Sequence, residues 1–418
     1  MNISQYLLAE IKKLKFDSCK NLVGLGGVQG VNFLIYWFSL FLWTRFVSKE
    51  IYGQYQLILS FSGIAGSFCL VGLGESLSIS AAKKNDGNLS VIILIKFGVS
   101  IAAAIGLGVV SHYYWDKDPS LARGILWLSC LFPLLQLSTI RQVWFNAKGW
   151  FALLILSNFL FALAPVLALA IIVFLGHTQS TVFFVITVQG VNAVLAVAFI
   201  LFLMARRENA KKDWKAIKYG FHASLAALLG WMILTDKMFI YKYLSASDVA
   251  VYSIALVFPD QIRVLFSLFN QILLPQIYAA GNVQEAWQYI KPKLIILSFF
   301  FISLGVIGFF AIPKVIPYLF SEKYASSVPY AKWLWLFQCI VAPTTYLANI
   351  LRAQQKVKFT YLFSISHPLL LFISFFILIR FGLPGIVAAK IFSYIYAGVF
   401  FLISFYHYNK RKCSSRVS

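Results

Sequence analysis

The sequence predicts an all-α integral membrane protein with about twelve transmembrane helices, in two six-helix parallel-repeat lobes around a central cavity. Of the 418 residues, 60% are hydrophobic and only 12% are charged, and the mean hydropathy is +0.80. Soluble domains do not reach such values, because too little polar surface would remain to face water. The apolar segments have the length of membrane-spanning helices, and basic residues concentrate in alternate loops.

The predicted spans are helices because segments such as 153–175 and 369–379 are apolar on all sides. A transmembrane β-barrel would instead alternate apolar and polar residues. The first six spans are expected at about 22–44, 55–80, 89–111, 122–145, 151–175 and 180–204. The other six are expected at about 219–243, 250–279, 294–319, 331–352, 359–380 and 385–407.

The loops differ strongly in basic residues. If the chain starts in the cytoplasm, the cytoplasmic segments hold more than twice as many lysines and arginines as the opposite segments. The positive-inside rule therefore predicts that both termini are cytoplasmic. Residues 1–20 are polar and Lys-rich, so no cleavable signal peptide is expected. Most of the basic residues that give the net charge of +22 lie on the expected cytoplasmic side. This charge therefore does not indicate a nucleic-acid partner.

The longest basic connector lies between the sixth and seventh spans and marks the expected domain boundary. Each half has six spans, an even number, so both halves must start on the same side of the membrane and have the same orientation, as in a parallel repeat. Weak self-similarity supports a duplication, since Arg45 and Tyr55 align with Lys242 and Tyr252 at one constant offset. The expected parts are a cytoplasmic amphipathic segment 1–20, an N-terminal lobe 21–205, a basic connector 206–218, a C-terminal lobe 219–408 and a basic tail 409–418.

Catalytic and metal-binding patterns are missing from the sequence. It contains no P-loop, and its five cysteines and five histidines have no metal-ligand or redox spacing. The predicted outer loops are short, and Asp116, Asp118 and Glu322 have no partner set there. We therefore expect no enzyme activity, no catalytic residue and no metal site.

We single out eight charged residues as intramembrane, since a charge at the centre of a span is unfavourable by roughly 2.5–3.5 kcal/mol. Such residues are the strongest indication of function in a membrane protein. The excess of cations predicts a cavity that attracts anions, phosphate above all, because arginine can bind it with two parallel hydrogen bonds. The cations are Lys96, Arg141, Lys237, Arg263 and Lys390, and the anions are Glu75, Asp236 and Asp260.

Polar side chains also follow one face of two predicted helices. Asp260 and Arg263 are three residues apart and share a face, which Asn270 continues one heptad later. A second polar stripe lies on the first predicted span. Because neither stripe can face lipid, we expect a water-filled cavity between the two halves. The stripe on the first span consists of Gln29, Asn32, Tyr36 and Ser39.

Each intramembrane charge also has a structural interpretation. Lys96 and Lys390 could extend to the headgroups from positions near a span end, and Arg141 could anchor the cytoplasmic end of its span. Asp236 and Lys237 are adjacent, so their side chains point about 100° apart and cannot pair directly. Either one could form an ion pair with another helix.

Five short segments are informative in combination. They are Arg45–Tyr55 (RFVSKEIYGQY) leading to Gly72, Leu73 and Gly74; Asp236 and Lys237 followed by Leu244–Tyr252; Val315–Tyr324 with Ala331; Leu351–Gln354; and Gly382–Gly385. Together these segments resemble the Wzx-type polysaccharide flippases, whose superfamily also contains multidrug and toxic-compound extruders and the peptidoglycan-precursor flippase. Lys237 departs from the family pattern, where arginine is more common, and it keeps the charge without the bidentate geometry.

The resemblance implies a flippase that moves an undecaprenyl-pyrophosphate-linked oligosaccharide from the cytoplasmic to the periplasmic leaflet of a bacterial inner membrane. Alternating access of the two lobes would drive this step in the biosynthesis of O-antigen, capsule or exopolysaccharide. The resemblance implies no cofactor, with H⁺ or Na⁺ as candidate coupling ions. The expected partners are the lipid-linked substrate, membrane lipids, a polysaccharide polymerase and a chain-length regulator.

We assign hypothetical roles to the intramembrane polar residues. The pyrophosphate would bind Arg263, Lys237, Arg141 and Lys96, and sugar hydroxyls would contact Asn270, Gln29, Asn32 and Tyr36. Asp236, Asp260 and Glu75 would carry the coupling ion or neutralise cations. Two alternatives stay open: a cation-coupled multidrug or metabolite antiporter of the same fold, which should have an acidic cavity, and a membrane polysaccharide polymerase or ligase, which the short outer loops disfavour.

Overall fold

The computed structural model describes residues 27, 30–279, 283–353 and 357–414, and every regular element in these ranges is helical. A helix over 30–46 comes first. The N-terminal half continues with α2 (Lys49–Ser67), α3 (Leu73–Ala82), α4 (Gly87–Tyr114), α5 (Pro119–Ala147), α6 (Phe151–Phe174), α7 (Thr181–Phe184), the π-helical η1 (Val185–Gln189) and α8 (Gly190–Ala205).

The C-terminal half begins with a span in three pieces and ends with long helices. Its elements are α9 (Trp214–Ala227), the 3₁₀ segment η2 (Leu228–Leu234), α10 (Asp236–Tyr243), α11 (Ala246–Ala279), α12 (Val283–Phe320), η3 (Glu322–Ser327), α13 (Val328–Val341), η4 (Ala342–Thr344), α14 (Thr345–Ala353), α15 (Val357–Leu378), η5 (Ile379–Phe381) and α16 (Leu383–Ser414).

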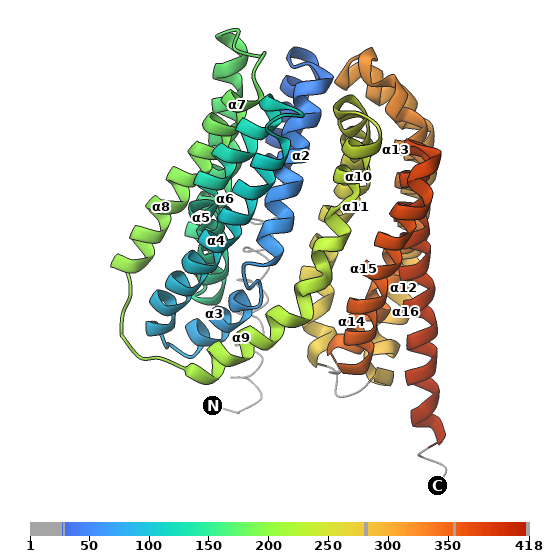
Figure 1. The fold of residues 1–418 in the computed structure, drawn as a ribbon. Helices are drawn as coiled ribbons and strands as arrows, with labels where there is room; N and C mark the ends of the chain where they lie inside the picture. Colours follow the sequence, from blue (N-terminus) through green and yellow to red (C-terminus); the bar gives the residue numbers. More distant parts are fainter. Residues whose placement is uncertain (1–26, 28–29, 280–282, 354–356, 415–418) are drawn as a thin grey trace.

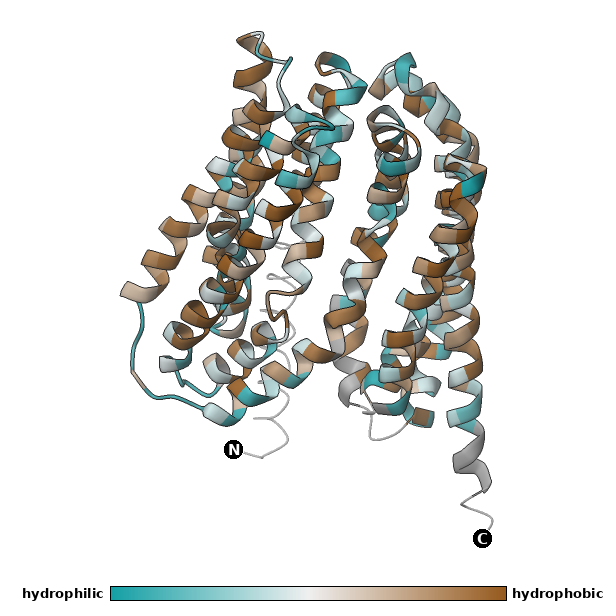
Figure 2. Cartoon of the chain, viewed as in Figure 1, coloured by the Kyte–Doolittle hydropathy of each residue, from teal (hydrophilic) through white to brown (hydrophobic). Residues whose placement is uncertain are grey.

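The fold confirms the predicted all-helical membrane protein. Ten helical segments in the described ranges are long and apolar enough to cross a membrane. The helix over 30–46 is too short for that set and α2 is too polar, yet both pack into the core through Trp43 and Tyr52 and bring the bundle to about twelve spans. Figure 2 shows apolar residues along most helices and hydrophilic residues in the loop that precedes α9.

The helices form two lobes (Figure 1). The N-terminal lobe contains the helix over 30–46 and α2–α8, and the C-terminal lobe contains α10–α16. Helix α9 runs obliquely from below the first lobe to the second. We call the membrane side that holds the 206–213 loop and α14 the connector side, and the opposite side, which holds η3 and the turn at 47–48, the far side.

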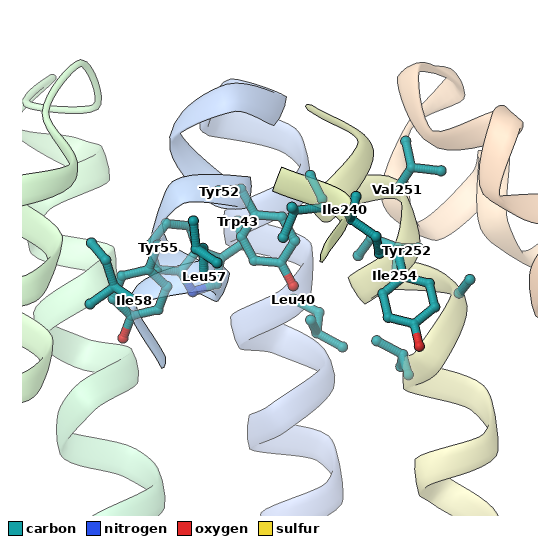
Figure 3. Close-up of a cluster of buried hydrophobic side chains, with 14 of the residues drawn as sticks. Leu40, Trp43, Tyr52, Tyr55, Leu57, Ile58, Ile240, Val251, Tyr252 and Ile254 are labelled. Carbon is teal, nitrogen blue, oxygen red and sulfur yellow. The ribbon is translucent and has the colours of Figure 1, made fainter. Parts of the chain in front are cut away.

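The two lobes touch closely on the far side. Gly53 of α2 lies so near α11 that a Cβ atom there would come within 1.8 Å of the Ala246 carbonyl oxygen. Lys323 Nζ donates to the Val47 carbonyl at 2.8 Å, and Arg45 Nη2 donates to the Tyr318 carbonyl at 2.8 Å. Figure 3 shows the apolar core continuing from the first helix and α2 into α10 and α11. The far side of the lobe interface is therefore closed.

The connector between the lobes is fixed to the N-terminal lobe. The Asn88 side chain donates to the Asp213 carbonyl at 2.9 Å and accepts from the Asp213 backbone N–H at 2.8 Å. Asp86 accepts from the Glu208 backbone N–H and pairs with Lys148 at 2.8 Å. Asp213 also caps α9, and the Ala216 N–H that donates to it lowers the pKa of this carboxyl. These bonds set the starting point of α9 on the N-terminal lobe.

Helix α9 then packs on α3 through small residues. The span that contains α2 breaks after Ser67, and Leu70 takes a left-handed backbone with φ 50° before α3 begins. A Cβ atom on Gly72 would lie 2.5 Å from the Gly220 carbonyl oxygen, so only glycine allows this approach. Ser224 Oγ accepts from the Gly72 backbone N–H at 3.0 Å.

Candidate functional site

The interruption of the seventh span places two charged residues in the interior. After the 3₁₀ segment η2, the Thr235 hydroxyl donates to the Met232 carbonyl at 2.8 Å, a local bond that competes with regular helix. Asp236 and Lys237 follow as the first residues of α10. A carboxylate in the first helical turn interacts favourably with the helix dipole. Local sequence thus explains why the charges lie at this break.

Asp236 is buried and has several donors. Lys390 Nζ of α16 lies 3.2 Å from Asp236 Oδ2, and only 7–8% of either side chain is exposed. The Tyr252 hydroxyl of α11 donates to the same oxygen at 2.9 Å, and the Lys237 backbone N–H donates to Oδ1 at 2.9 Å. A buried carboxylate is tolerated only with such compensation. Lys390 therefore forms an ion pair in the core and does not extend to the headgroups.

These groups border a cavity of about 320 Å³ at the interface of the lobes. Lys237 Nζ donates to Gln56 Oε1 of α2 at 2.8 Å, and the Ser60 hydroxyl donates to the Leu234 carbonyl at 2.6 Å. Because α2 belongs to one lobe and α10 to the other, both lobes form the walls. The lining, here named the charged cavity, is Gln56, Leu59, Ser60, Gly63, Ile233, Leu234, Asp236, Lys237, Leu256, Asp260, Arg263 and Lys390.

Arg263 and Asp260 complete the charged cavity from α11. Arg263 Nη1 lies 3.2 Å from Asp260 Oδ1, with 55% and 49% of the two side chains exposed. An exposed pair of this kind contributes little stability, and its partners can exchange for other ions. Arg263 is thus held near one carboxylate and stays accessible from the cavity.

The charged cavity has one positive charge in excess, because Lys237, Arg263 and Lys390 face only Asp236 and Asp260. A cationic cavity with a low-dielectric surrounding attracts anions. Its polar lining also suits sugar hydroxyls or bridging water. No group of three or more metal-ligating side chains occurs in the described ranges.

The two cations predicted in the N-terminal lobe lie elsewhere. Lys96 Nζ of α4 donates to the Thr139 hydroxyl at 2.9 Å. Arg141 of α5 donates to Ser157 and, at 3.0 Å, to Asn158 of α6, and its guanidinium lies 4.3 Å from the centre of the Phe161 ring. Both are about 95% buried, so neither reaches the headgroups, and neither lines the charged cavity.

The other predicted polar residues are dispersed. Gln29 lies outside the described residues. Asn32 and Tyr36 are on the first helix, and neither they nor Asn270, which accepts from Asn349 at 3.3 Å, line the charged cavity. Glu75 is exposed on α3 and accepts from the Tyr219 hydroxyl of α9 at 3.3 Å. The structure therefore brings together Lys237, Arg263, Asp236 and Asp260 and leaves the rest apart.

Four participants were not assigned to the site from the sequence, namely Gln56, Ser60, Tyr252 and Lys390. Gln56 and Ser60 are four residues apart on a helix that is too polar for a simple span, and that spacing could have revealed them. Lys390 was recognised as an intramembrane cation, but its carboxylate partner is 154 residues away. No local pattern indicates such a pair.

A family model described as polysaccharide biosynthesis protein matches residues 42–329, which is more than half of the chain. The chain belongs to this polysaccharide biosynthesis protein family. The charged cavity lies partly within the matched segment, and Lys390 follows it. No curated protein matches the sequence at a significant level.

Solved structures of transporters share the fold of this polysaccharide biosynthesis protein. An inward-facing multidrug resistance MATE family transporter of the MOP superfamily has a TM-score of 0.72 at 13% identity, covering 90% of this chain and 95% of that chain. The lipid II flippase MurJ in an inward closed conformation has a TM-score of 0.63 at 13% identity, covering 91% and 86%.

A third neighbour is a MOP superfamily transporter from Pyrococcus furiosus, whose binding pocket is described as having reverse polarity that suggests a different function. Its TM-score is 0.63 at 13% identity, covering 94% of this chain and 95% of that chain. The chain is thus a multi-pass membrane protein of the polysaccharide biosynthesis family, and its fold is that of these transporters and of this flippase.

Proposed function

We propose that this protein is a flippase that moves an undecaprenyl-pyrophosphate-linked oligosaccharide between leaflets of a bacterial inner membrane, for surface polysaccharide biosynthesis. The charged cavity between the lobes carries the proposal. Its three cations would bind the pyrophosphate, while its amide and hydroxyl groups would contact sugar. The connector side, with its basic residues, would face the cytoplasm.

The closed far side supports a direction for loading. Because α2 and α11 are in contact near Gly53, the charged cavity has no path to the far side between these helices. We infer that the substrate headgroup enters from the connector side and leaves after the far-side contacts open. Asp236 and Asp260 would compensate the charges of Lys390 and Arg263 when no anion is bound. A proton or Na⁺ is the candidate ion whose gradient would drive transport.

The polarity of the charged cavity argues against a cation antiporter of the same fold. A cationic drug would meet three positive side chains and only two carboxylates, one of which is buried against Lys390. Moving a cation into that environment is unfavourable. An anionic headgroup instead gains charge-assisted hydrogen bonds, which are about twice as strong as neutral ones.

The test is translocation of a fluorescent polyprenyl-pyrophosphate oligosaccharide in proteoliposomes. Loss of a hydrogen bond to a charged group is unfavourable by roughly 1.5–3 kcal/mol, so Arg263→Ala should slow translocation roughly tenfold to a hundredfold. Arg263→Lys should keep part of the rate, because it retains the charge. The matched control is Arg380→Ala, which removes an exposed arginine beside Phe381 and should leave the translocation rate unchanged.

Full translocation by Arg263→Ala, with the protein folded and at equal amounts, would remove Arg263 from the mechanism. Uptake of a cationic dye driven by an ion gradient, together with no translocation of the lipid-linked oligosaccharide, would favour the antiporter. Elongation of the oligosaccharide by the purified protein would favour a polymerase.

A further inference from the structure

A second cavity lies at the lobe interface, and η2 contributes to its lining as it does to that of the charged cavity. Its volume is about 420 Å³. Within η2 and its end, Ile233 and Leu234 line the charged cavity, whereas Trp231 and Thr235 line the second one. Ile64 of α2 also lines it, so both lobes contribute. Residues of this 3₁₀ segment therefore line both cavities.

This second cavity, here named the aromatic groove, is lined mainly by rings. Trp231 and Phe239 both lie against Phe372, with ring centres 5.9 and 5.6 Å apart. Phe376, at its edge, is 65% exposed. Exposed rings on the membrane-spanning part of a protein favour an apolar occupant. The rings are Tyr114, Trp231, Phe239, Tyr243, Phe372 and Phe376.

Two lysines from different lobes lie at the far-side end of the aromatic groove. Lys242 lines the groove and lies 5.2 Å from the centre of the Tyr243 ring. Lys117 lies 3.7 Å from the Tyr113 ring, which is itself 5.2 Å from the ring of the groove residue Tyr114. Both lysines are exposed, and neither forms an ion pair within the part of the chain that the structure describes.

Asp118, the half-buried carboxylate that follows Lys117 in the chain, already has hydrogen-bond donors. Asp118 accepts from the Gln54 amide at 2.9 Å, from the Tyr241 hydroxyl at 2.7 Å and from the Leu121 backbone N–H at 3.0 Å. These three neutral donors stabilise its ionised form, and it forms no ion pair with Lys117 or Lys242 in the described ranges. Asp116, beside Lys117, is exposed and likewise forms no ion pair with either lysine in the described part of the chain. The groove therefore has an apolar length and, at one end, two ammonium groups that no carboxylate of the described residues pairs with.

We propose that the aromatic groove binds the hydrocarbon chain of an anionic lipid whose headgroup lies at Lys117 and Lys242 in the far-side leaflet. The chain packs along the rings, and the phosphate contacts the two ammonium groups. The identity of that chain as a polyprenyl chain rests on the proposed function. Because η2 borders both this groove and the charged cavity, the groove is placed to receive the lipid after its headgroup has crossed.

The test is photo-crosslinking of the full chain in nanodiscs with a diazirine-bearing polyprenyl phosphate, followed by mass spectrometry of the labelled peptides. We expect labels on α10, α15 and the end of α4. Phe376→Ala should reduce labelling of these peptides severalfold, while Phe310→Ala, an equally exposed phenylalanine on α12, should not. Lys242→Gln should weaken capture of the phosphate roughly fivefold, since a lysine near a membrane surface contributes about 1 kcal/mol to anionic lipid binding.

An uncharged polyprenol of the same length should label the same peptides less strongly and should be insensitive to Lys242→Gln. Labels spread evenly over lipid-facing helices, or equal capture of both probes, would overturn the proposal. This test distinguishes a failure of this inference from a failure of the proposed function. A flippase that shows no groove labelling loses only this inference, whereas groove labelling without any translocation of the lipid-linked oligosaccharide contradicts the proposed function.

Discussion

Cations occur in the interior of both lobes' spans, but the two lobes compensate them differently. In the N-terminal lobe, Arg141 and Lys96 bind hydroxyl and amide oxygens, and Arg141 also lies against a phenylalanine ring. In the C-terminal lobe, Lys390 and Arg263 pair with carboxylates beside an open cavity. The first arrangement fills a helix interface. The second arrangement places charged pairs next to a space that a ligand can enter.

The comparison shows that an intramembrane charge alone does not indicate a binding site. The cations of the C-terminal lobe differ from those of the N-terminal lobe in lying beside a cavity, and Arg263 has a carboxylate partner that another anion can replace. Arg263 is about half exposed and has a carboxylate that a phosphate can replace, whereas Arg141 is 6% exposed and enclosed by α6 and α8 residues. The following predictions test this distinction, beginning with the largest expected effect.

Lys390→Met should destabilise the protein most, because it leaves Asp236 buried and without its ammonium partner. Breaking a buried ion pair in this way is unfavourable by about 3–5 kcal/mol. The measurement is thermal unfolding in detergent. The double variant Asp236→Asn with Lys390→Met should recover most of the loss, and a single variant as stable as the double would refute the pairing.

Arg141→Met should affect stability and leave transport intact. It removes the guanidinium but leaves the Ser157 and Asn158 acceptors in place without this donor, at a cost of about 1–3 kcal/mol. We expect a lower unfolding temperature and a normal translocation rate per folded molecule. Abolished translocation with unchanged stability would show that the N-terminal lobe also binds substrate, and the comparison would fail.

Gln56→Leu should give the smallest effect. It removes the acceptor of Lys237 from the wall of the charged cavity, and a single hydrogen bond contributes about 0.5–1.5 kcal/mol. We expect translocation to fall up to roughly tenfold. Leu59→Met, a volume-conserving change on the same wall, is the control and should have no effect. Equal rates for both variants would remove the α2 wall from substrate contact.

The fold was predictable because hydropathy and the distribution of basic residues are properties of the local sequence. Long apolar segments such as 153–175 could be assigned directly, since lipid requires helices there. The interruption at Leu228–Leu234 and the break after Ser67 could not, because both depend on packing against other helices, as the approach of Gly72 to Gly220 illustrates.

The site was predictable only in part. Asp236, Lys237, Asp260 and Arg263 were recognisable because charge is rare in a membrane span. Their common cavity depends on α2 and α16, which lie far away in the sequence. For the same reason, Arg141 could not be distinguished from Arg263, since their difference lies in the neighbouring helices.

The most direct test of the account is equilibrium binding of radiolabelled polyprenyl pyrophosphate to purified, folded Arg263→Gln and Arg141→Met proteins. We predict that Arg263→Gln weakens binding at least roughly tenfold and that Arg141→Met binds like the unaltered protein. Equal affinity of the Arg263→Gln and unaltered proteins, or a selective loss in Arg141→Met, would contradict the assignment of the anion site to the charged cavity.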